Sequence, residues 1–318
     1  MTKLPSAIAA VSAFIALIIF PDAAKGSVIS GLRLCAELII PSLFPFFIVS
    51  SLLNELGIAA AIGKRLSPIS SRLFGASGCG TSAFFIGISG GYPVGASYIA
   101  DMRRKGVIGS DEASRLLIFC NNSGPAFIIG AAGIGVFRSA GAGLLLYAAH
   151  IIAALVWGMI LRGKSENEHN EAVFAASYSL GEALTRSVKS SVSAVLSVCG
   201  FVAAFSVLTG LLDASGAVSL LAGKLSAVLG TEIHWSRALL AGLLELGNGI
   251  GSMQGLAVSP LNLALAAFLL GWGGVSVYFQ TCSVIAGTDI KTARYLTGRF
   301  LIALTAAAVA LLGAAVMF

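Results

Sequence analysis

The chain has 318 residues, of which 57% are hydrophobic and only 11% are charged, and its mean hydropathy is +0.93. A soluble domain carries roughly 25% charged residues, so this composition excludes a soluble protein and predicts a polytopic integral membrane protein. The formal net charge of +6 is expected to lie in loops, and no nucleic-acid partner is expected. We predict an all-α fold, because a membrane β-barrel would show alternating segments of roughly ten residues.

Apolar runs long enough to span a bilayer recur from one end of the chain to the other. Spanning the hydrocarbon takes about 20 mainly apolar residues. Such runs lie at residues 4 to 20, 34 to 53, 116 to 137, 141 to 161, 189 to 212, 261 to 286 and 297 to 318, and two more, at 83 to 100 and 238 to 256, are interrupted by glycine. The first run is interpreted as a retained helix and not as a signal peptide, because no soluble mature domain follows it.

Basic residues lie between the apolar runs. By the positive-inside rule, Lys64, Arg65 and Arg72 and the later segment from Arg103 to Lys105 are expected on the cytoplasmic side. Several others depart from this pattern: Arg138, Arg162, Lys164, Arg186 and Lys189. The sequence therefore leaves the absolute orientation open.

The polar stretch from Arg162 to Arg186 divides the chain into two similar halves. Residues 52 to 57 resemble residues 211 to 216, and Gly63-Lys64 corresponds to Gly223-Lys224. We predict an N-terminal helix and linker (1 to 30), a first repeat (31 to 161), a polar linker (162 to 185) and a second repeat (186 to 318), with the repeats inverted. Interrupted segments at corresponding positions of two repeats indicate a transporter's binding site. Chance similarity between apolar helices is the alternative.

The run from 116 to 137 is broken at its centre by Asn121, Asn122, Ser123, Gly124 and Pro125. At membrane depth a helix can be broken only where the freed backbone groups face protein or a water-filled cavity. Transporters use such half-helices to hold a solute near the bilayer midplane, because the helix N-termini offer amides to anionic groups. This segment is therefore predicted to be non-helical and to face a polar cavity near residues 90 to 93.

The two glycine-interrupted runs carry further candidate residues. Gly90, Gly91, Tyr92 and Pro93 predict an unwound or re-entrant helix, because the glycines allow non-helical geometry and the proline cannot continue the helix. In the second half, Glu245 and Asn248 lie inside an apolar run. An intramembrane carboxylate is costly and usually functional. Glu245 is therefore a candidate for coupling protons or orienting solute, and the alternative is a helix-end residue at the interface.

Trp272, Ser276 and Gln280 occupy the position in the second half that corresponds to the Asn121 segment, and they are added to the candidate substrate-binding set. Neither a metal site nor a cofactor is predicted. The cysteines show no C-x-x-C spacing, and His150, His169 and His234 lie in separate segments. An enzyme is not expected. The alternative is a rhomboid-like intramembrane serine protease using Ser89 and His150, because Gly87-Ile88-Ser89-Gly90 matches the G-x-S-G motif of that class.

Taken as an ordered set, these motifs resemble the YlbJ family of sporulation integral membrane proteins, the family of stage V sporulation protein V. The resemblance covers nearly the whole chain, and the residues that carry it are Gly90 to Gly95, Arg103 to Lys105, Glu112 to Leu117, Asn121 to Pro125, Phe127 to Gly130, and Gly271 to Gly274 before Gln280. It implies two nucleoside-recognition Gate domains and movement of dipicolinic acid during endospore formation. The family's usual motif has Thr where this chain has Asn122.

The resemblance and the broken helices together predict a transporter of a small anion that works by alternating access. The solute expected first is dipicolinate. The expected location is the bacterial cell membrane, in the mother-cell-derived membrane around the forespore. Expected partners are the anionic solute, the lipid bilayer, a coupling proton or sodium ion, and a second copy of the chain. Two alternatives remain open at this point: a nucleoside or other small-solute transporter, and a non-transporting membrane scaffold of spore assembly.

Overall fold

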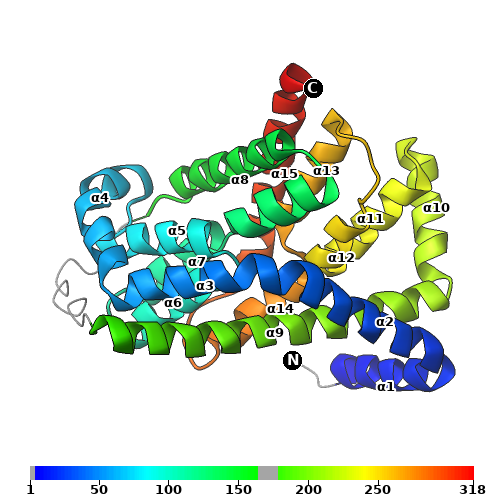
Figure 1. The fold of residues 1–318 in the computed structure, drawn as a ribbon, viewed down its shortest axis with the longest axis horizontal. Coiled ribbons are helices and arrows are strands. Elements are labelled where there is room, and N and C mark those ends of the chain that lie inside the picture. Colours follow the sequence, from blue (N-terminus) through cyan, green and yellow to red (C-terminus); the bar gives the residue numbers. More distant parts are fainter. Residues whose placement is uncertain (1–3, 164–177) are drawn as a thin grey trace.

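The computed structural model describes residues 4–163 and 178–318, and within these ranges it contains helices and connecting segments but no strand (Figure 1). The predicted polar linker at 162 to 185 lies mostly outside the described residues. The helices are α1 (Leu4–Ile19), α2 (Pro21–Leu34), the π-helical η1 (Cys35–Ile39), α3 (Ile40–Glu55), α4 (Ile58–Phe74), α5 (Gly78–Gly90), α6 (Val94–Arg104), α7 (Ser110–Cys120), the π-helical η2 (Ala126–Val136), α8 (Ala140–Ile160), α9 (Leu180–Ala214), α10 (Ala217–Leu229), α11 (Ile233–Leu244), α12 (Leu246–Gly251), α13 (Pro260–Trp272), α14 (Gly274–Ile285) and α15 (Tyr295–Met317).

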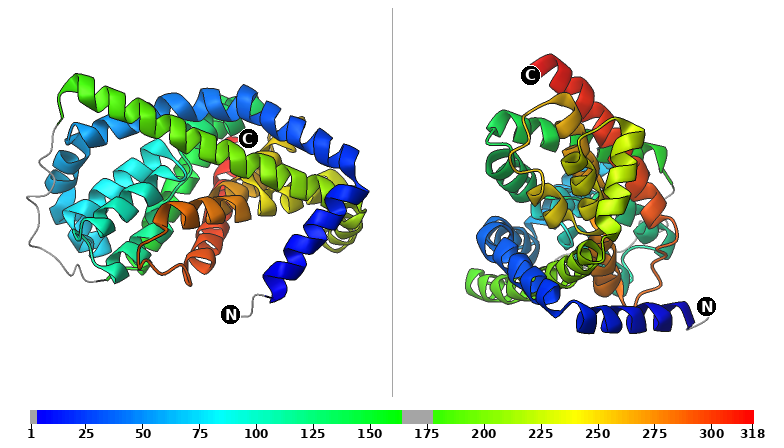
Figure 2. Two further views of the ribbon diagram at one scale, coloured as in Figure 1. Left: turned by 90° about the horizontal axis from the view of Figure 1, so that it is seen from below. Right: turned by 90° about the vertical axis from the view of Figure 1, so that its right-hand side faces the viewer.

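Two long helices run side by side in opposite directions (Figures 1 and 2). One is formed by α2, η1 and α3 without interruption and the other is α9, and each has 35 residues. At ~1.5 Å per residue each is about 52 Å long, which exceeds the ~30 Å hydrocarbon core. Arg186 near the start of α9 pairs with Glu55 at the end of α3, with 3.0 Å between Nε and Oε2. The predicted run at 34 to 53 is thus part of a longer helix, which also crosses the predicted boundary between residues 30 and 31.

Five helical segments of the described chain are long and apolar enough to cross a membrane: the α2–α3 segment, α8, α9, the α13–α14 segment and α15. A sixth is possible if the α4–α5 pair, which is bent by 95°, counts as one span. Small residues let neighbouring helices approach closely. Gly133 of η2 lies against Gly143 of α8, and Gly271 of α13 lies against Ala303 of α15. The all-α polytopic membrane class predicted from composition is confirmed.

The elements that follow each long helix occur in the same order in both halves of the chain. In the first half α4, α5, α6, α7, η2 and α8 follow α3, and in the second half α10, α11, α12, α13, α14 and α15 follow α9. In each series two helices are interrupted near the middle of the molecule. The two repeats, and the superposition of the halves by an inverting rotation, stay predictions.

Candidate functional site at the meeting of the broken helices

The two breaks of the first half touch each other. One separates α5 from α6 and contains the cis peptide bond between Tyr92 and Pro93. The other runs from Asn121 to Gly124, between α7 and η2, and is not helical, whereas Pro125, which the prediction included, already has helical geometry. A Cβ atom added to Gly91, whose φ is 86°, would lie 2.9 Å from the backbone nitrogen of Gly124. Only glycine can combine this left-handed conformation with so close an approach.

The second half repeats this contact with different residues. Glu245 adopts an extended conformation, with φ −142° and ψ 122°, between α11 and α12. Gly273, with a φ value of 82°, separates α13 from α14, and Gly274, the first residue of α14, has a φ value of 83°. A Cβ atom on Gly274 would lie 3.1 Å from the carbonyl oxygen of Leu244 and 3.2 Å from the Cα of Glu245. Each half therefore packs one break against the other through a glycine.

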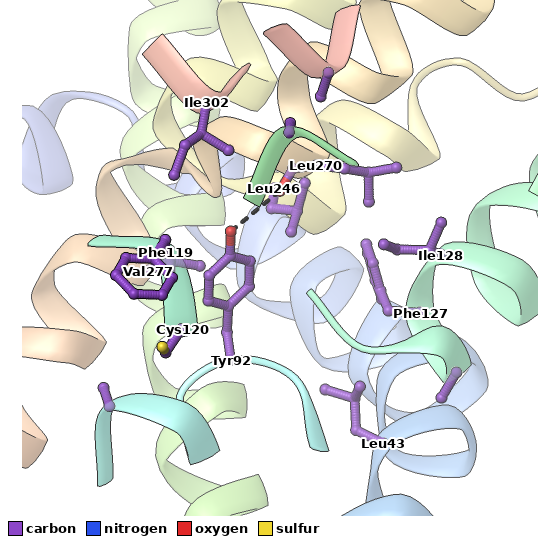
Figure 3. Close-up of a cluster of buried hydrophobic side chains, with 14 of the residues drawn as sticks. Leu43, Tyr92, Phe119, Cys120, Phe127, Ile128, Leu246, Leu270, Val277 and Ile302 are labelled. Atoms are coloured by element: carbon purple, nitrogen blue, oxygen red, sulfur yellow. Dashed lines mark hydrogen bonds between the residues drawn. The ribbon is translucent and has the colours of Figure 1, made fainter. Parts of the chain in front are cut away.

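A cavity of about 40 Å³ lies where the breaks of the two halves meet. Tyr92, Ser123 and Gly124 line it from the first half, and Glu245, Gly247 and Gln280 line it from the second. Its remaining walls are apolar: Ile39, Leu43, Phe127, Val198, Val202, Leu246 and Val277. Figure 3 shows Tyr92 among several of these side chains, with its hydroxyl directed to Leu270. The cavity has room for about one water molecule.

Glu245 is the acidic group of this cavity and is 2% exposed. Its Oε2 accepts a hydrogen bond of 2.6 Å from the backbone nitrogen of Asn248, so the carboxylate caps the N-terminus of α12. The positive end of the helix dipole and the freed amides favour a negative group at this position. Among the described residues no ion pair to Glu245 occurs, so the cap and the cavity form its polar environment.

Arg299 of α15 is a central residue outside the candidate set predicted from the sequence. Its side chain is fully buried, and it donates hydrogen bonds to the Tyr92 hydroxyl, to Gly271 O and, at 3.1 Å, to Ile118 O. Ile118 and Gly271 lie in the last turns of α7 and α13, so the cation binds the negative ends of one broken helix from each half. An arginine inside the apolar run at 297 to 318 is the signal that would have identified it.

Asn121 and Asn122 hold the two halves together in this conformation. The Asn121 amide donates to the Thr281 hydroxyl at 3.0 Å and to the Tyr295 hydroxyl at 2.8 Å. The Asn122 oxygen accepts a 3.4 Å hydrogen bond from Arg299. Both asparagines are fully buried, and neither lines the central cavity. Their donors would face a solute only if the halves moved apart.

The remaining candidates lie around the centre. Trp272 donates to Leu243 O at 3.0 Å, and Gln280 donates to the Ser276 hydroxyl at 3.1 Å. Gly90 is buried beside Val94, and Pro125 directly precedes η2. Of the predicted set, the structure brings Tyr92, Ser123, Gly124, Glu245 and Gln280 into one cavity. Pro93 and Asn248 line two larger cavities instead.

These larger cavities lie on either side of the central one along α9. A cavity of about 410 Å³ is lined by α9 residues between 190 and 197, and a cavity of about 790 Å³ by α9 residues between 206 and 214. The central cavity takes Val198 and Val202 from the stretch between them. Ser50, Asn54 and Ser97 contribute to the smaller flanking cavity, while Ser206, Asn248 and Arg237 contribute to the larger one.

Ser89 and His150, the alternative protease pair, are each engaged elsewhere. The Ser89 hydroxyl donates to Phe85 O at 2.8 Å within its own helix. His150 Nε2 accepts a 3.2 Å hydrogen bond from the backbone nitrogen of Ser123. No hydrogen bond between the two side chains occurs in the described part of the chain. A cluster of His, Cys, Asp and Glu able to hold a metal ion is likewise absent from residues 4–163 and 178–318.

Comparison with known proteins gives one informative relative. The chain is 33% identical over 308 residues to the sporulation integral membrane protein YlbJ of Bacillus subtilis (strain 168), and the match covers 88% of this chain and 75% of that protein. No family model matches the chain. No solved structure matches it either.

Proposed function

Because the chain belongs to the YlbJ family of sporulation integral membrane proteins, we propose that it transports a small anionic solute by alternating access around its broken helices. The observation that carries the proposal is the row of three cavities along α9: a small centre of about 40 Å³ between larger cavities of about 410 and 790 Å³. A solute would enter the centre from one flanking cavity and leave through the other. Helices broken at corresponding positions of two halves are a common basis for such motion.

Dipicolinate is the solute we propose, with sporulation as its setting and the membrane around the forespore as its location. It is a planar dianion, and Arg299 offers a planar guanidinium that can bind a carboxylate through two parallel hydrogen bonds. Tyr92 lies beside Arg299, with the guanidinium carbon 5.3 Å from the ring centroid. Backbone amides at the starts of η2 and α14 add donors for the second carboxylate.

The size of the central cavity sets a requirement for this mechanism. A volume of about 40 Å³ holds about one water molecule and is too small for dipicolinate. Binding of dipicolinate therefore requires the breaks of the two halves to separate. That separation would free Arg299, Asn121 and Asn122 from their present partners at the moment when the solute can replace them.

Uptake of labelled dipicolinate into proteoliposomes tests the proposal, with imposed proton or sodium gradients to identify a coupling ion. We expect saturable uptake of the labelled dipicolinate. Excess unlabelled dipicolinate should abolish this uptake, and excess uridine should leave it unchanged. Protein-free liposomes are the control. Saturable uptake of uridine in place of dipicolinate would support the nucleoside alternative. Folded protein that moves neither solute would contradict the proposal and favour the scaffold alternative.

A further inference from the structure

Helix α4 presents three different faces along its length. Ala59, Gly63, Ser70 and Phe74 are buried against the rest of the protein. At 3.6 residues per turn, Ile58, Leu66, Ile69 and Leu73 form a second face, which is apolar and exposed. Lys64, Arg65 and Arg72 form a third face, opposite the buried one, on which Arg65 and Arg72 adjoin the apolar face, and all three are exposed. A helix with one face packed on protein, one apolar face and one basic face is typical of the membrane–water boundary.

The connection to α5 supports the same placement. The two helices are bent by 95°, so α4 lies across the direction in which α5 enters the protein. The bend is held by Arg115 of α7, which donates to Phe74 O at 2.6 Å and to Gly75 O at 3.1 Å. An interfacial helix lies in the plane of the membrane, with its apolar face buried in the boundary between headgroups and acyl chains. The basic face of α4 then lies at the depth of the headgroups.

We propose that this face, consisting of Lys64, Arg65 and Arg72, binds the headgroups of anionic phospholipids. Arg162 extends it, because it is exposed and the next residue, Gly163, donates a 3.4 Å hydrogen bond to Phe74 O at the end of α4. Clustered Lys and Arg at a membrane surface attract anionic lipids, and each contributes about fivefold to their local concentration. The site is independent of the transport activity proposed above.

The helix at the corresponding place in the second half lacks this face. Helix α10 exposes Leu220, Leu221 and Val228, and Lys224 is its one basic residue. If the two helices only packed against the rest of the protein, their exposed faces would not need to differ in charge. Because only α4 carries a basic face, we infer that α4 lies in the leaflet rich in anionic lipid. That leaflet is the cytoplasmic one.

The test compares the full-length protein in nanodiscs of phosphatidylcholine with and without phosphatidylglycerol. The variant combines Lys64→Gln, Arg65→Gln and Arg72→Gln. The control combines Lys25→Gln, Arg33→Gln and Lys224→Gln, which remove the same charge from exposed positions on α2 and α10. Two quantities are measured: the phosphatidylglycerol that copurifies with the protein, and the unfolding midpoint in each lipid mixture. Equal midpoints in pure phosphatidylcholine show that all three proteins are folded.

We expect the α4 variant to retain at least about fivefold less phosphatidylglycerol than wild type and to lose the rise in midpoint that this lipid causes. The control variant should behave like wild type. Retention of as much phosphatidylglycerol by the α4 variant as by wild type overturns the proposal. An equal loss of phosphatidylglycerol in both variants also overturns it, because that loss would reflect net charge alone. Inorganic phosphate added to pure phosphatidylcholine nanodiscs should leave the unfolding midpoint unchanged. A rise in the midpoint as large as the one caused by phosphatidylglycerol would show that the basic face binds free anions instead of lipid.

Discussion

The guanidinium of Arg299 donates a hydrogen bond to the hydroxyl of Tyr92, although 207 positions separate the two residues in the chain. Tyr92 belongs to a break of the first half, and Arg299 belongs to the closing helix of the second. The same guanidinium also binds Gly271 O of the second half and Ile118 O of the first. Arg299 is therefore a direct polar link between the halves, and it must release part of these contacts if they separate.

Arg299→Gln is expected to destabilise the protein by about 2–4 kcal/mol, because charge-assisted hydrogen bonds to buried carbonyl groups are lost. Arg299→Lys should cost less, since it keeps the charge but not the planar fork. Thermal unfolding in detergent measures both effects, with the exposed Lys224→Gln as the control. A midpoint of Arg299→Gln equal to wild type would contradict the assigned role.

Gly124→Ala tests the contact between the two breaks of the first half. The added Cβ would lie 3.1 Å from the backbone nitrogen of Gly91 and 3.2 Å from its Cα, so two backbone segments must move apart. We expect a loss of about 1–3 kcal/mol in unfolding free energy. Gly200→Ala is the matched control, because a Cβ there meets nothing within 4 Å and alanine favours the helix. Equal stability of the two variants would show that the breaks do not need this approach.

Glu245→Gln removes the charge from the central cavity while keeping the shape of the side chain. If Glu245 couples protons or orients solute, the variant should be folded and should show lost transport or a flattened pH dependence. Proteoliposome uptake of dipicolinate across a range of pH values measures this at equal protein content. Unchanged uptake and an unchanged pH profile would exclude coupling by Glu245 and leave its cap on Asn248 as a purely structural contact.

The inverted repeat predicts that residues 31 to 161 superpose on residues 186 to 316 by a rotation about an axis in the membrane plane. Helices α4 and α10 would then lie at opposite surfaces of the membrane. In intact vesicles, a membrane-impermeant maleimide should label Arg72→Cys and Lys224→Cys from opposite sides, with the unsubstituted protein as the control for its native cysteines. Labelling of both positions from the same side would contradict the inversion.

Asp289, in the loop between α14 and α15, forms an ion pair with Arg103, with 2.7 Å between Oδ1 and Nε. The hydrogen bond from Arg103 lowers the pKa of this carboxyl group. A depressed pKa in the folded protein means that the pair favours folding above the ordinary pKa of aspartate and that this contribution is lost as the pH falls. Asp289→Asn should therefore lower the unfolding midpoint slightly at pH 7, and the difference should shrink as the pH falls below the ordinary pKa of aspartate. A pH-independent difference would contradict the assignment.

Composition and local chemistry were sufficient to predict the membrane class and the helix breaks of the first half, while the breaks predicted at 245 to 249 and 271 to 280 are each a single non-helical residue, Glu245 and Gly273. The segment from Asn121 to Pro125 interrupts a helix because of residues within the segment itself, and the same holds for Gly91 to Pro93. Such effects act over a few positions and can be recognised in the sequence. The predicted limits of the run at 34 to 53 were too narrow. The charged residues Asp22, Lys25 and Arg33 suggest a loop, but they lie in helix α2, where Lys25 and Arg33 are exposed.

What the breaks contact was decided only by the tertiary structure. Asn121 was predicted to face a cavity, yet its donors are taken by Thr281 and Tyr295, which lie 160 and 174 positions away. Arg299 was not selected at all, because an arginine near the start of an apolar run is compatible with an interfacial position. Its role follows from the convergence of two helix ends, one from each half, on one buried cation. Contacts between distant segments depend on how the halves pack, and no local pattern of residues encodes them.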